Sequence, residues 1–263
     1  MAATTAPPAD RVIVAGTLVA CAALAGLAAA AISSGMGTAM DAGMGAGMAM
    51  EGHPVPPPWT IADIAVGFAM WTAMMTAMML PSAAPMTTMF SRLVRRQADT
   101  GSAATRTGLF VGGYLAAWSG VALAAAVVQQ LLSSGGLLLG DSLGTGLAGA
   151  VLVGAGVYQL TPAKQACLRR CRTPLGFLLN EWRDGAFGSA VMGLRHGMWC
   201  AGCCVGLMAV LFVVGVMSLG WMAALAVIVL VEKTVPWGAA IARLAGSGLI
   251  AFGVWSIVPL VWR

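Results

Sequence analysis

Charged residues are scarce in this sequence. They make up 9% of its 263 residues, whereas a soluble domain carries about 25%. Residues of the apolar class make up 59%. A chain with so few polar groups cannot cover a globule in water, so lipid must cover it instead. The composition therefore predicts an integral membrane protein and excludes a soluble domain.

Aromatic residues are also few, at 7%, and no ten-residue segments of alternating polarity occur. Both absences argue against an outer-membrane β-barrel, so we expect an all-α bundle of transmembrane helices. With only two histidines in total, the sequence argues against a bis-histidine haem. No phosphate-binding glycine loop, nucleophile triad or dinucleotide fingerprint is present. We therefore expect a protein that handles a ligand rather than an enzyme, and no nucleic-acid partner.

Seven apolar segments are predicted to be membrane spans, and crossing ~30 Å of hydrocarbon takes about 20 residues. They run over residues 11–33, 61–80, 107–132, 142–160, 198–216, 219–231 and 237–258. The first resembles a signal peptide in part, but its long apolar run favours a retained helix. Pro81 and Pro85 are expected to end or kink the second. The whole chain, 1–263, is predicted to be one integral membrane domain.

Small residues at four-residue spacing indicate where these helices pack. Gly108 and Gly112 form such a step in the third segment. Gly146, Ala150 and Gly154 repeat it in the fourth. We therefore expect close helix contacts at these two faces.

The distribution of basic residues predicts the orientation. Every Lys and Arg except Arg11 and Arg263 lies in or beside the loops after the second, fourth and sixth segments. Basic loops remain in the cytoplasm, so the N-terminus is expected inside and the C-terminus outside. The Met-, Gly- and Pro-rich loop 34–60 then faces outward. The basic loop 161–196, with a short interfacial helix, faces the cytoplasm. The expected location is the bacterial cytoplasmic (inner) membrane.

The strongest chemical motif lies near the start of the fifth segment. It consists of His196, Cys200, Cys203, Cys204 and Met208. At about 100° per residue, positions 196, 200, 204 and 208 form one stripe on a helix. Thiolate and thioether ligands favour soft ions such as Cu(I) or Zn(II). Packing by small apolar cysteines is the alternative, but three cysteines in five residues beside a histidine favour a metal site.

A second pair of cysteines, Cys167 and Cys171, lies one helical turn apart in the basic loop. The two clusters are predicted on the same side of the membrane. They can form one site of four or five sulfurs, or a redox pair, and the sequence leaves both open. Cys21 stands alone in an apolar segment and is expected to serve packing.

Methionines form a further pattern. Met36, Met40, Met44 and Met48 recur every four residues in the outer loop and are followed by His53. A polar loop has no core to fill, so these thioethers favour capture of copper outside the membrane. Met74 and Met78 repeat the spacing in the second segment. There, packing is the stronger interpretation, because methionine fills gaps in apolar cores.

Several of these motifs together resemble the bacterial DUF2182 family. The motifs are the segments 71–81, 158–164, 200–208 and 232–233, with Cys167 and Cys171. The resemblance covers residues 61–237 and departs at Val205, where the family often has an aromatic residue. Members are described as predicted metal-binding integral membrane proteins. The resemblance therefore implies a polytopic membrane protein with a metal site and no established activity.

The leading hypothesis is a membrane protein that handles or transports a soft metal, copper first and zinc as the alternative. A membrane thiol–disulfide oxidoreductase using the CxxC of Cys200 and Cys203 is the second hypothesis. The third is an accessory subunit that supports assembly of a partner metalloenzyme. The partners expected are the lipid bilayer and either another protein or a second copy of the chain.

Overall fold

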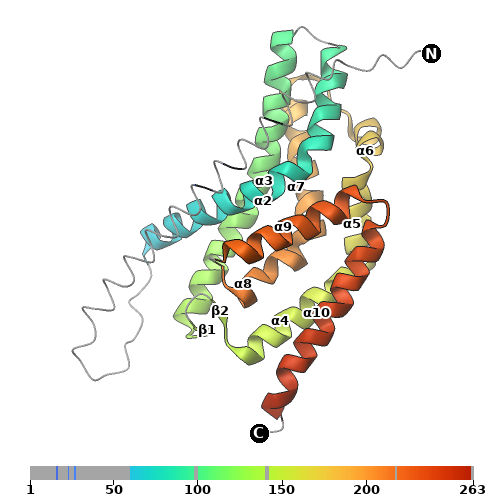
Figure 1. Cartoon of the computed structure of the whole chain (residues 1–263). Helices are drawn as coiled ribbons and strands as arrows, with labels where there is room; N and C mark the ends of the chain where they lie inside the picture. The colour runs from blue at the N-terminus through green and yellow to red at the C-terminus, as the bar shows by residue number, and fades with distance from the viewer. Residues whose placement is uncertain are drawn as a thin grey trace.

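The computed structural model describes residues 60–97, 100–139, 142–216 and 218–261, and the helical positions Gly16, Ala23 and Leu27. The predicted first span and the predicted outer loop 34–60, with its methionines and His53, lie outside the well-described part. Over the described residues the fold is all-α apart from one pair of two-residue strands, as the sequence predicts. Figure 1 shows long helices crossing one another, with the C-terminal helix α10 at one side.

The described elements follow one another along the chain. They are α2 (Ile61–Arg95), α3 (Thr100–Ser134), β1 (Leu138–Leu139), β2 (Ser142–Leu143), α4 (Thr145–Leu160), α5 (Pro162–Arg172), α6 (Pro174–Glu181), α7 (Gly185–Ala209), α8 (Leu211–Val214), α9 (Leu219–Thr234) and α10 (Gly238–Val261). The antiparallel strands β1 and β2 close the connection between α3 and α4.

Helix α2 begins with a capping box and continues past two prolines. The Thr60 hydroxyl accepts from the backbone N–H of Asp63, whose carboxylate accepts from the backbone N–H of Thr60. The helix then runs to Arg95, so of the two outcomes expected for Pro81 and Pro85, an end or a kink, the prolines do not end it. Figure 1 shows its two halves running in different directions, as expected where proline removes a backbone hydrogen bond.

Four helices are apolar and long enough to cross a membrane within the described ranges. They are Ile61–Arg95, Ser102–Ser134, Gly185–Val214 and Gly238–Pro259. The pair α4 and α5, bent by 61°, provides a fifth candidate. Helix α9 spans only 16 residues. The chain is therefore a helical protein with several candidate membrane spans.

Two loops predicted from polarity are largely helical. The polar stretch expected between the second and third spans is shortened by α2, which reaches Arg95, and by α3, which begins at Thr100. The basic stretch 161–196 folds into α5, α6 and the first half of α7. The predicted short helix is present as α6. His196 consequently lies inside a long helix rather than at the end of a loop.

Glycines let two pairs of helices approach closely, but the contacting faces differ from those predicted. A Cβ atom on Gly197 would lie 2.9 Å from the Tyr114 carbonyl oxygen, so α7 packs directly on the α3 backbone. A Cβ atom on Gly156 would lie 2.6 Å from the Gly246 carbonyl oxygen, which joins α4 to α10. Gly108, Gly112 and Gly154 face open space. Four-residue spacing therefore indicated close packing but not the face.

The main buried core contains the sulfur-bearing residues. Methionines of α2 lie in it together with the cysteines of α7, and aromatic residues of α3 complete it. A smaller cluster around Phe90 and Phe110 fills the space near the α2–α3 turn. The core thus places the motif cysteines where several helices meet.

Candidate metal centre

Helix α5 packs on α7, and this contact brings the two predicted cysteine groups together. Cys200, Cys203 and Cys204 are each at most 2% exposed on α7. Cys167 and Cys171 lie on α5 and are partly buried. Thr161 caps α5 by accepting from the backbone N–H of Lys164, and Pro162 occupies its first turn. This local stop between α4 and α5 turns the second cysteine pair toward α7.

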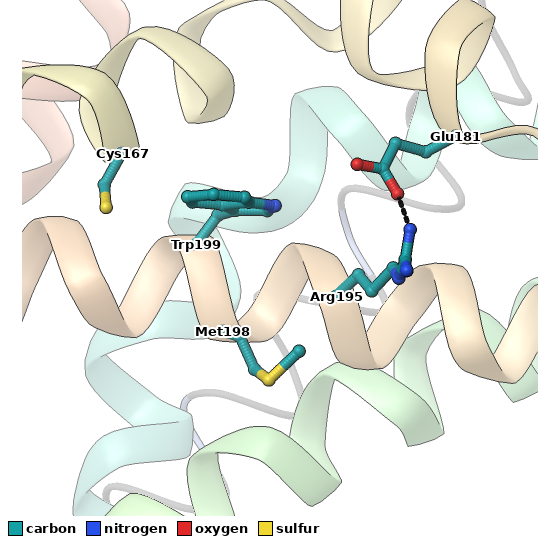
Figure 2. A pocket seen from close by; sticks show the side chains of 5 residues that line it. All are labelled: Cys167, Glu181, Arg195, Met198 and Trp199. Atoms are coloured by element: carbon teal, nitrogen blue, oxygen red, sulfur yellow. Dashed lines mark hydrogen bonds and ion pairs between the residues drawn. The ribbon is translucent and has the colours of Figure 1, made fainter.

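The two helices leave a pocket of about 430 Å³ on one side of their contact. Its lining residues are Cys167, Glu181, Arg195, Met198 and Trp199. Figure 2 shows Cys167 and Trp199 on facing helices, with the Glu181–Arg195 ion pair at the other end. One motif cysteine is therefore reached from a pocket.

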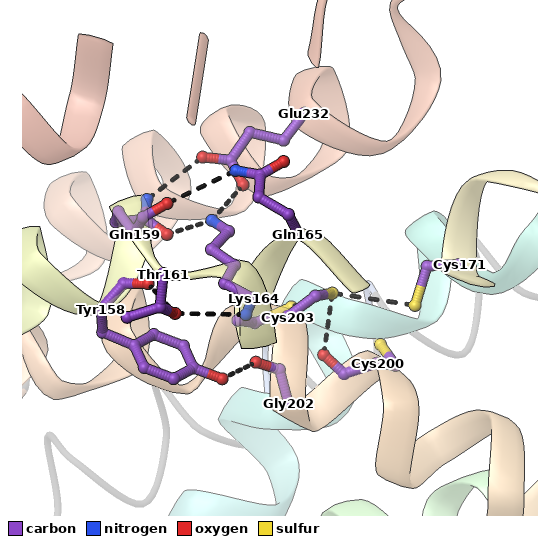
Figure 3. A network of polar contacts seen from close by, with 11 residues as sticks. Tyr158, Gln159, Thr161, Lys164, Gln165, Cys171, Cys200, Gly202, Cys203 and Glu232 are labelled. Carbon is purple, nitrogen blue, oxygen red and sulfur yellow. Dashed lines mark hydrogen bonds and ion pairs between the residues drawn. The ribbon is translucent and has the colours of Figure 1, made fainter. Parts of the chain in front are cut away.

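The remaining motif cysteines form a group of sulfur atoms that we call the thiol cluster: Cys171, Cys200, Cys203 and Cys204. The Cys203 Sγ atom lies 3.7 Å from the Cys171 Sγ atom and 3.4 Å from the Cys204 Sγ atom. Figure 3 shows Cys203 between Cys171 and the Cys200 carbonyl oxygen, to which its thiol donates at 3.1 Å. The cluster therefore joins α5 and α7 through Cys203.

The spacing of these sulfur atoms suits a shared soft ion. Two sulfurs bound tetrahedrally to one ion at about 2.3 Å each lie roughly 3.8 Å apart. The Cys171–Cys203 separation of 3.7 Å is close to that distance. Nevertheless, no three His, Cys, Asp or Glu side chains are already gathered around a metal position in the described ranges. Binding an ion would require the thiols to turn toward one point.

A cation and a phenol lie beside Cys200. The Lys233 ammonium is 3.0 Å from the Cys200 Sγ atom and also donates to the Ser82 hydroxyl. The Tyr114 hydroxyl lies 3.1 Å from the same sulfur. Helices α2, α3 and α9 thus each contribute a polar group next to the cluster. The cluster therefore has a positive charge at one edge.

Lys164, Gln159 and Glu232 form a second buried polar group, which we call the ion-pair network. The Lys164 ammonium lies 2.6 Å from the Glu232 carboxylate, and the two side chains are 0% and 1% exposed. Gln159 donates to Glu232 and accepts from Lys164 (Figure 3). This network joins α4, α5 and α9.

His196 is buried but lies among aromatic rings. Its ring centroid is 5.4 Å from that of Phe177 and 5.8 Å from that of Tyr114. The Nδ1 atom of His196 has no hydrogen-bond partner within the described part of the chain. The role of His196 as a metal ligand stays a prediction.

The candidate methionines of the described helices are buried. Met74, Met78 and Met208 belong to the same core cluster as Cys200, Cys203 and Cys204. Their side chains are therefore packed in the same core as the thiols. Burial among apolar residues is what the packing interpretation predicts, and a role as ligands stays a prediction.

Sequence reasoning missed two relations in this region. Adjacent Glu232 and Lys233 look like a local ion pair, yet Glu232 binds Lys164 and Lys233 contacts Cys200. The Tyr158 hydroxyl, in turn, donates to the Gly202 carbonyl oxygen and joins α4 to α7. The sequence does carry a sign that Glu232 and Lys233 have separate partners. Consecutive side chains on a helix point about 100° apart.

The fold and the site define a class: a helical protein with candidate membrane spans and buried thiols joined across two helices. A family described as PpoB2, copper chaperone, matches residues 68–256, and the chain belongs to this family. No curated protein and no solved structure matches the chain. The copper-related expectation from the sequence is thus confirmed at the level of the family.

Proposed function

We propose that the protein is an integral membrane copper handler that holds Cu(I) on the thiol cluster and passes it to a partner protein. The observation that carries this proposal is the convergence of Cys171 from α5 with Cys203 and Cys204 from α7. Sulfur ligands of this kind select soft ions such as Cu(I). The family description, copper chaperone, favours copper over zinc.

The charge around the cluster supports a monovalent ion. Cu(I) bound by two thiolates carries a net charge of −1, which is costly to bury without a partner. The Lys233 ammonium, 3.0 Å from the Cys200 sulfur, would bring that sum to zero. His196 and Met208, one turn before and two turns after Cys200 along α7, are proposed as auxiliary ligands.

We propose the membrane arrangement predicted from the basic residues: seven spans in the bacterial inner membrane, with the N-terminus inside and the C-terminus outside. One contact supports a common side for the segments after α4 and α9. The Arg172 guanidinium donates to the Val235 and Pro236 carbonyl oxygens at 2.7 Å. The thiol cluster would then be near the cytoplasmic side. Met36, Met40, Met44, Met48 and His53 would capture copper outside.

Metal content of the purified full chain tests the holding site. Protein loaded with Cu(I) under anaerobic, reducing conditions should contain copper in a fixed ratio. Cys203→Ser should lose most of that copper while remaining folded and membrane-inserted. Cys21→Ser provides a control matched in chemistry. Full copper occupancy in the Cys171→Ser, Cys203→Ser and Cys204→Ser variants would overturn the proposal.

A thiol–disulfide oxidoreductase is the second candidate function. The Cys171–Cys203 separation of 3.7 Å favours it, since a small movement would allow a bond between the two sulfurs. The Cys171 sulfur is a contact of the Cys203 sulfur, so we propose that this pair, rather than the CxxC of Cys200 and Cys203, would form the disulfide. A reversible Cys171–Cys203 disulfide found by mass spectrometry in protein that binds no copper would favour this function.

The accessory-subunit hypothesis concerns the protein that receives the copper. We propose that the receiver of the copper is a separate protein that needs the metal for its assembly. Copurification of the intact chain from membranes, followed by transfer of copper to the copurified protein, tests this step. Copper that remains bound in the presence of every copurified protein would argue against a chaperone.

A further inference from the structure

The pocket between α5 and α7 carries two sulfur atoms of different kinds. The Cys167 thiol lies at one end, and Met198, which is 56% exposed, lines the same space. Trp199 stands beside them, and the Arg170 guanidinium lies over its ring at 4.2 Å. The pocket therefore combines soft metal ligands with a cationic rim.

The rim has an excess of positive charge. Arg170 and Arg195 both bind the carboxylate of Glu181. Their side chains are 49% and 42% exposed, whereas that of Glu181 is 13% exposed. One carboxylate cannot neutralise two guanidinium groups, so one positive charge remains. A ligand that enters here meets a surface that attracts anions.

Helix α5 connects the pocket with the thiol cluster, because it carries both Cys167 and Cys171. The Cys167 sulfur lies against Gly202, where a Cβ atom would approach it to 2.9 Å. Cys171 is one turn further along α5 and is 3.7 Å from Cys203. Cys167 thus lines the pocket and precedes a residue of the thiol cluster by one helical turn.

We propose that this pocket is the port through which Cu(I) is exchanged, and that it accepts the ion as the complex of a small anionic thiol. Cys167 is the first ligand of the protein in this transfer. The inference rests on the proposed function, because it needs a holding site beyond the port. A volume of about 430 Å³ accommodates a peptide-sized thiol, and the arginines bind its carboxylates.

The transfer is a ligand exchange without oxidation or reduction. The Cys167 thiol gives its proton to the leaving thiolate of the donor, and its sulfur forms a bond to Cu(I). The bond between Cu(I) and the donor sulfur breaks, and the donor leaves as a thiol. A second exchange moves the ion from Cys167 to Cys171, and the proton released there returns to Cys167. Copper stays monovalent throughout.

Loading kinetics of the full chain in lipid nanodiscs test the port. Cu(I)–glutathione serves as the anionic donor, because its ligand carries carboxylates, and Cu(I)–dithiothreitol as the donor whose ligand has none. Cys167→Ser should load from Cu(I)–glutathione at least about tenfold more slowly, because the positioned first ligand is absent. Its final copper content should equal that of the unaltered protein. Arg195→Gln should slow loading about threefold from the anionic donor alone, as expected for an exposed charge.

Gly202→Ala provides a variant that keeps every thiol. The added methyl group displaces the Cys167 sulfur, so loading should slow while final copper content is unchanged. An unchanged loading rate in Cys167→Ser would overturn the port, as would equal slowing of Arg195→Gln with both donors. Loss of final copper content in Cys167→Ser would make Cys167 a holding ligand and also overturn it. In this loading experiment, the proposed function would be contradicted only if the unaltered chain took up no copper.

Discussion

The ion-pair network and the thiol cluster are both buried, but they differ in how completely their polar atoms are paired. In the network, Lys164, Gln159 and Glu232 bind one another directly. In the cluster, Cys200 contacts Lys233 and Tyr114, whereas the Cys203 thiol makes only weak contacts with neighbouring sulfurs and with the Cys200 carbonyl oxygen. Sulfur lone pairs therefore stay open. The paired group is suited to holding helices together, and the open group is suited to binding an ion.

The largest effect on stability should come from breaking the ion-pair network. Lys164→Met leaves the Glu232 carboxylate buried without its cation, which typically costs about 3–5 kcal/mol. Thermal unfolding of the purified protein should show a much lower melting temperature. The double variant Lys164→Met with Glu232→Gln should recover much of the loss. A single variant as stable as the unaltered protein would show that the network is not structural.

At the thiol cluster we expect a large effect on copper affinity and a small effect on stability. Cys203→Ser should weaken Cu(I) binding by about 100-fold, equivalent to ~2.7 kcal/mol, because Cys203 contacts both neighbouring sulfurs. Its melting temperature should change far less than that of Lys164→Met. Competition with a chromophoric Cu(I) chelator measures the affinity. If Cys203→Ser and Lys164→Met changed copper affinity and melting temperature equally, the thiol cluster and the ion-pair network would not differ in role.

Lys233 should have a smaller effect on the same affinity. Lys233→Met removes the ammonium beside Cys200 and should weaken Cu(I) binding about tenfold, or ~1.4 kcal/mol. Lys233→Arg keeps the charge and should restore most of the affinity. If arginine and methionine at this position give the same affinity, the charge plays no part and the contact is only steric.

The smallest effects should come from the methionines of α2. Met74→Leu and Met78→Leu conserve volume in the core and should cost less than about 1.5 kcal/mol of stability. Copper affinity should stay within about twofold of the unaltered protein. The chelator competition used for Cys203 measures it. A tenfold loss for either variant would extend the metal site from the thiols to the thioethers.

The sequence predicted the class of fold and the cysteine motif because both depend on local patterns. Scarce charge and long apolar segments indicate helices in a membrane, and the spacing of Cys200, Cys203 and Cys204 places them on one side of α7. The link to Cys171 needed the tertiary structure, because it depends on how α5 lies on α7. The sequence left this pairing as one of two alternatives.

The partners of Glu232 and Lys233 were beyond sequence reasoning for a related reason. Adjacent opposite charges suggest an ion pair with each other. In the folded chain, however, Glu232 binds Lys164 on α5 and Lys233 contacts Cys200 on α7. Gly108 and Gly112 show the same limit for packing: their spacing fits a helix contact, but the contacting glycines are elsewhere. Local spacing gives the type of interaction, and the choice among faces depends on the whole bundle.

Because Glu232 and Lys233 are consecutive residues of α9, one rigid helix joins the two buried groups. A rotation of α9 about its axis that withdrew Lys233 from Cys200 would also pull Glu232 away from Lys164. The strong, dry ion pair therefore fixes the rotational setting of the helix. The Glu232–Lys164 ion pair therefore also holds the Lys233 ammonium beside the Cys200 thiol.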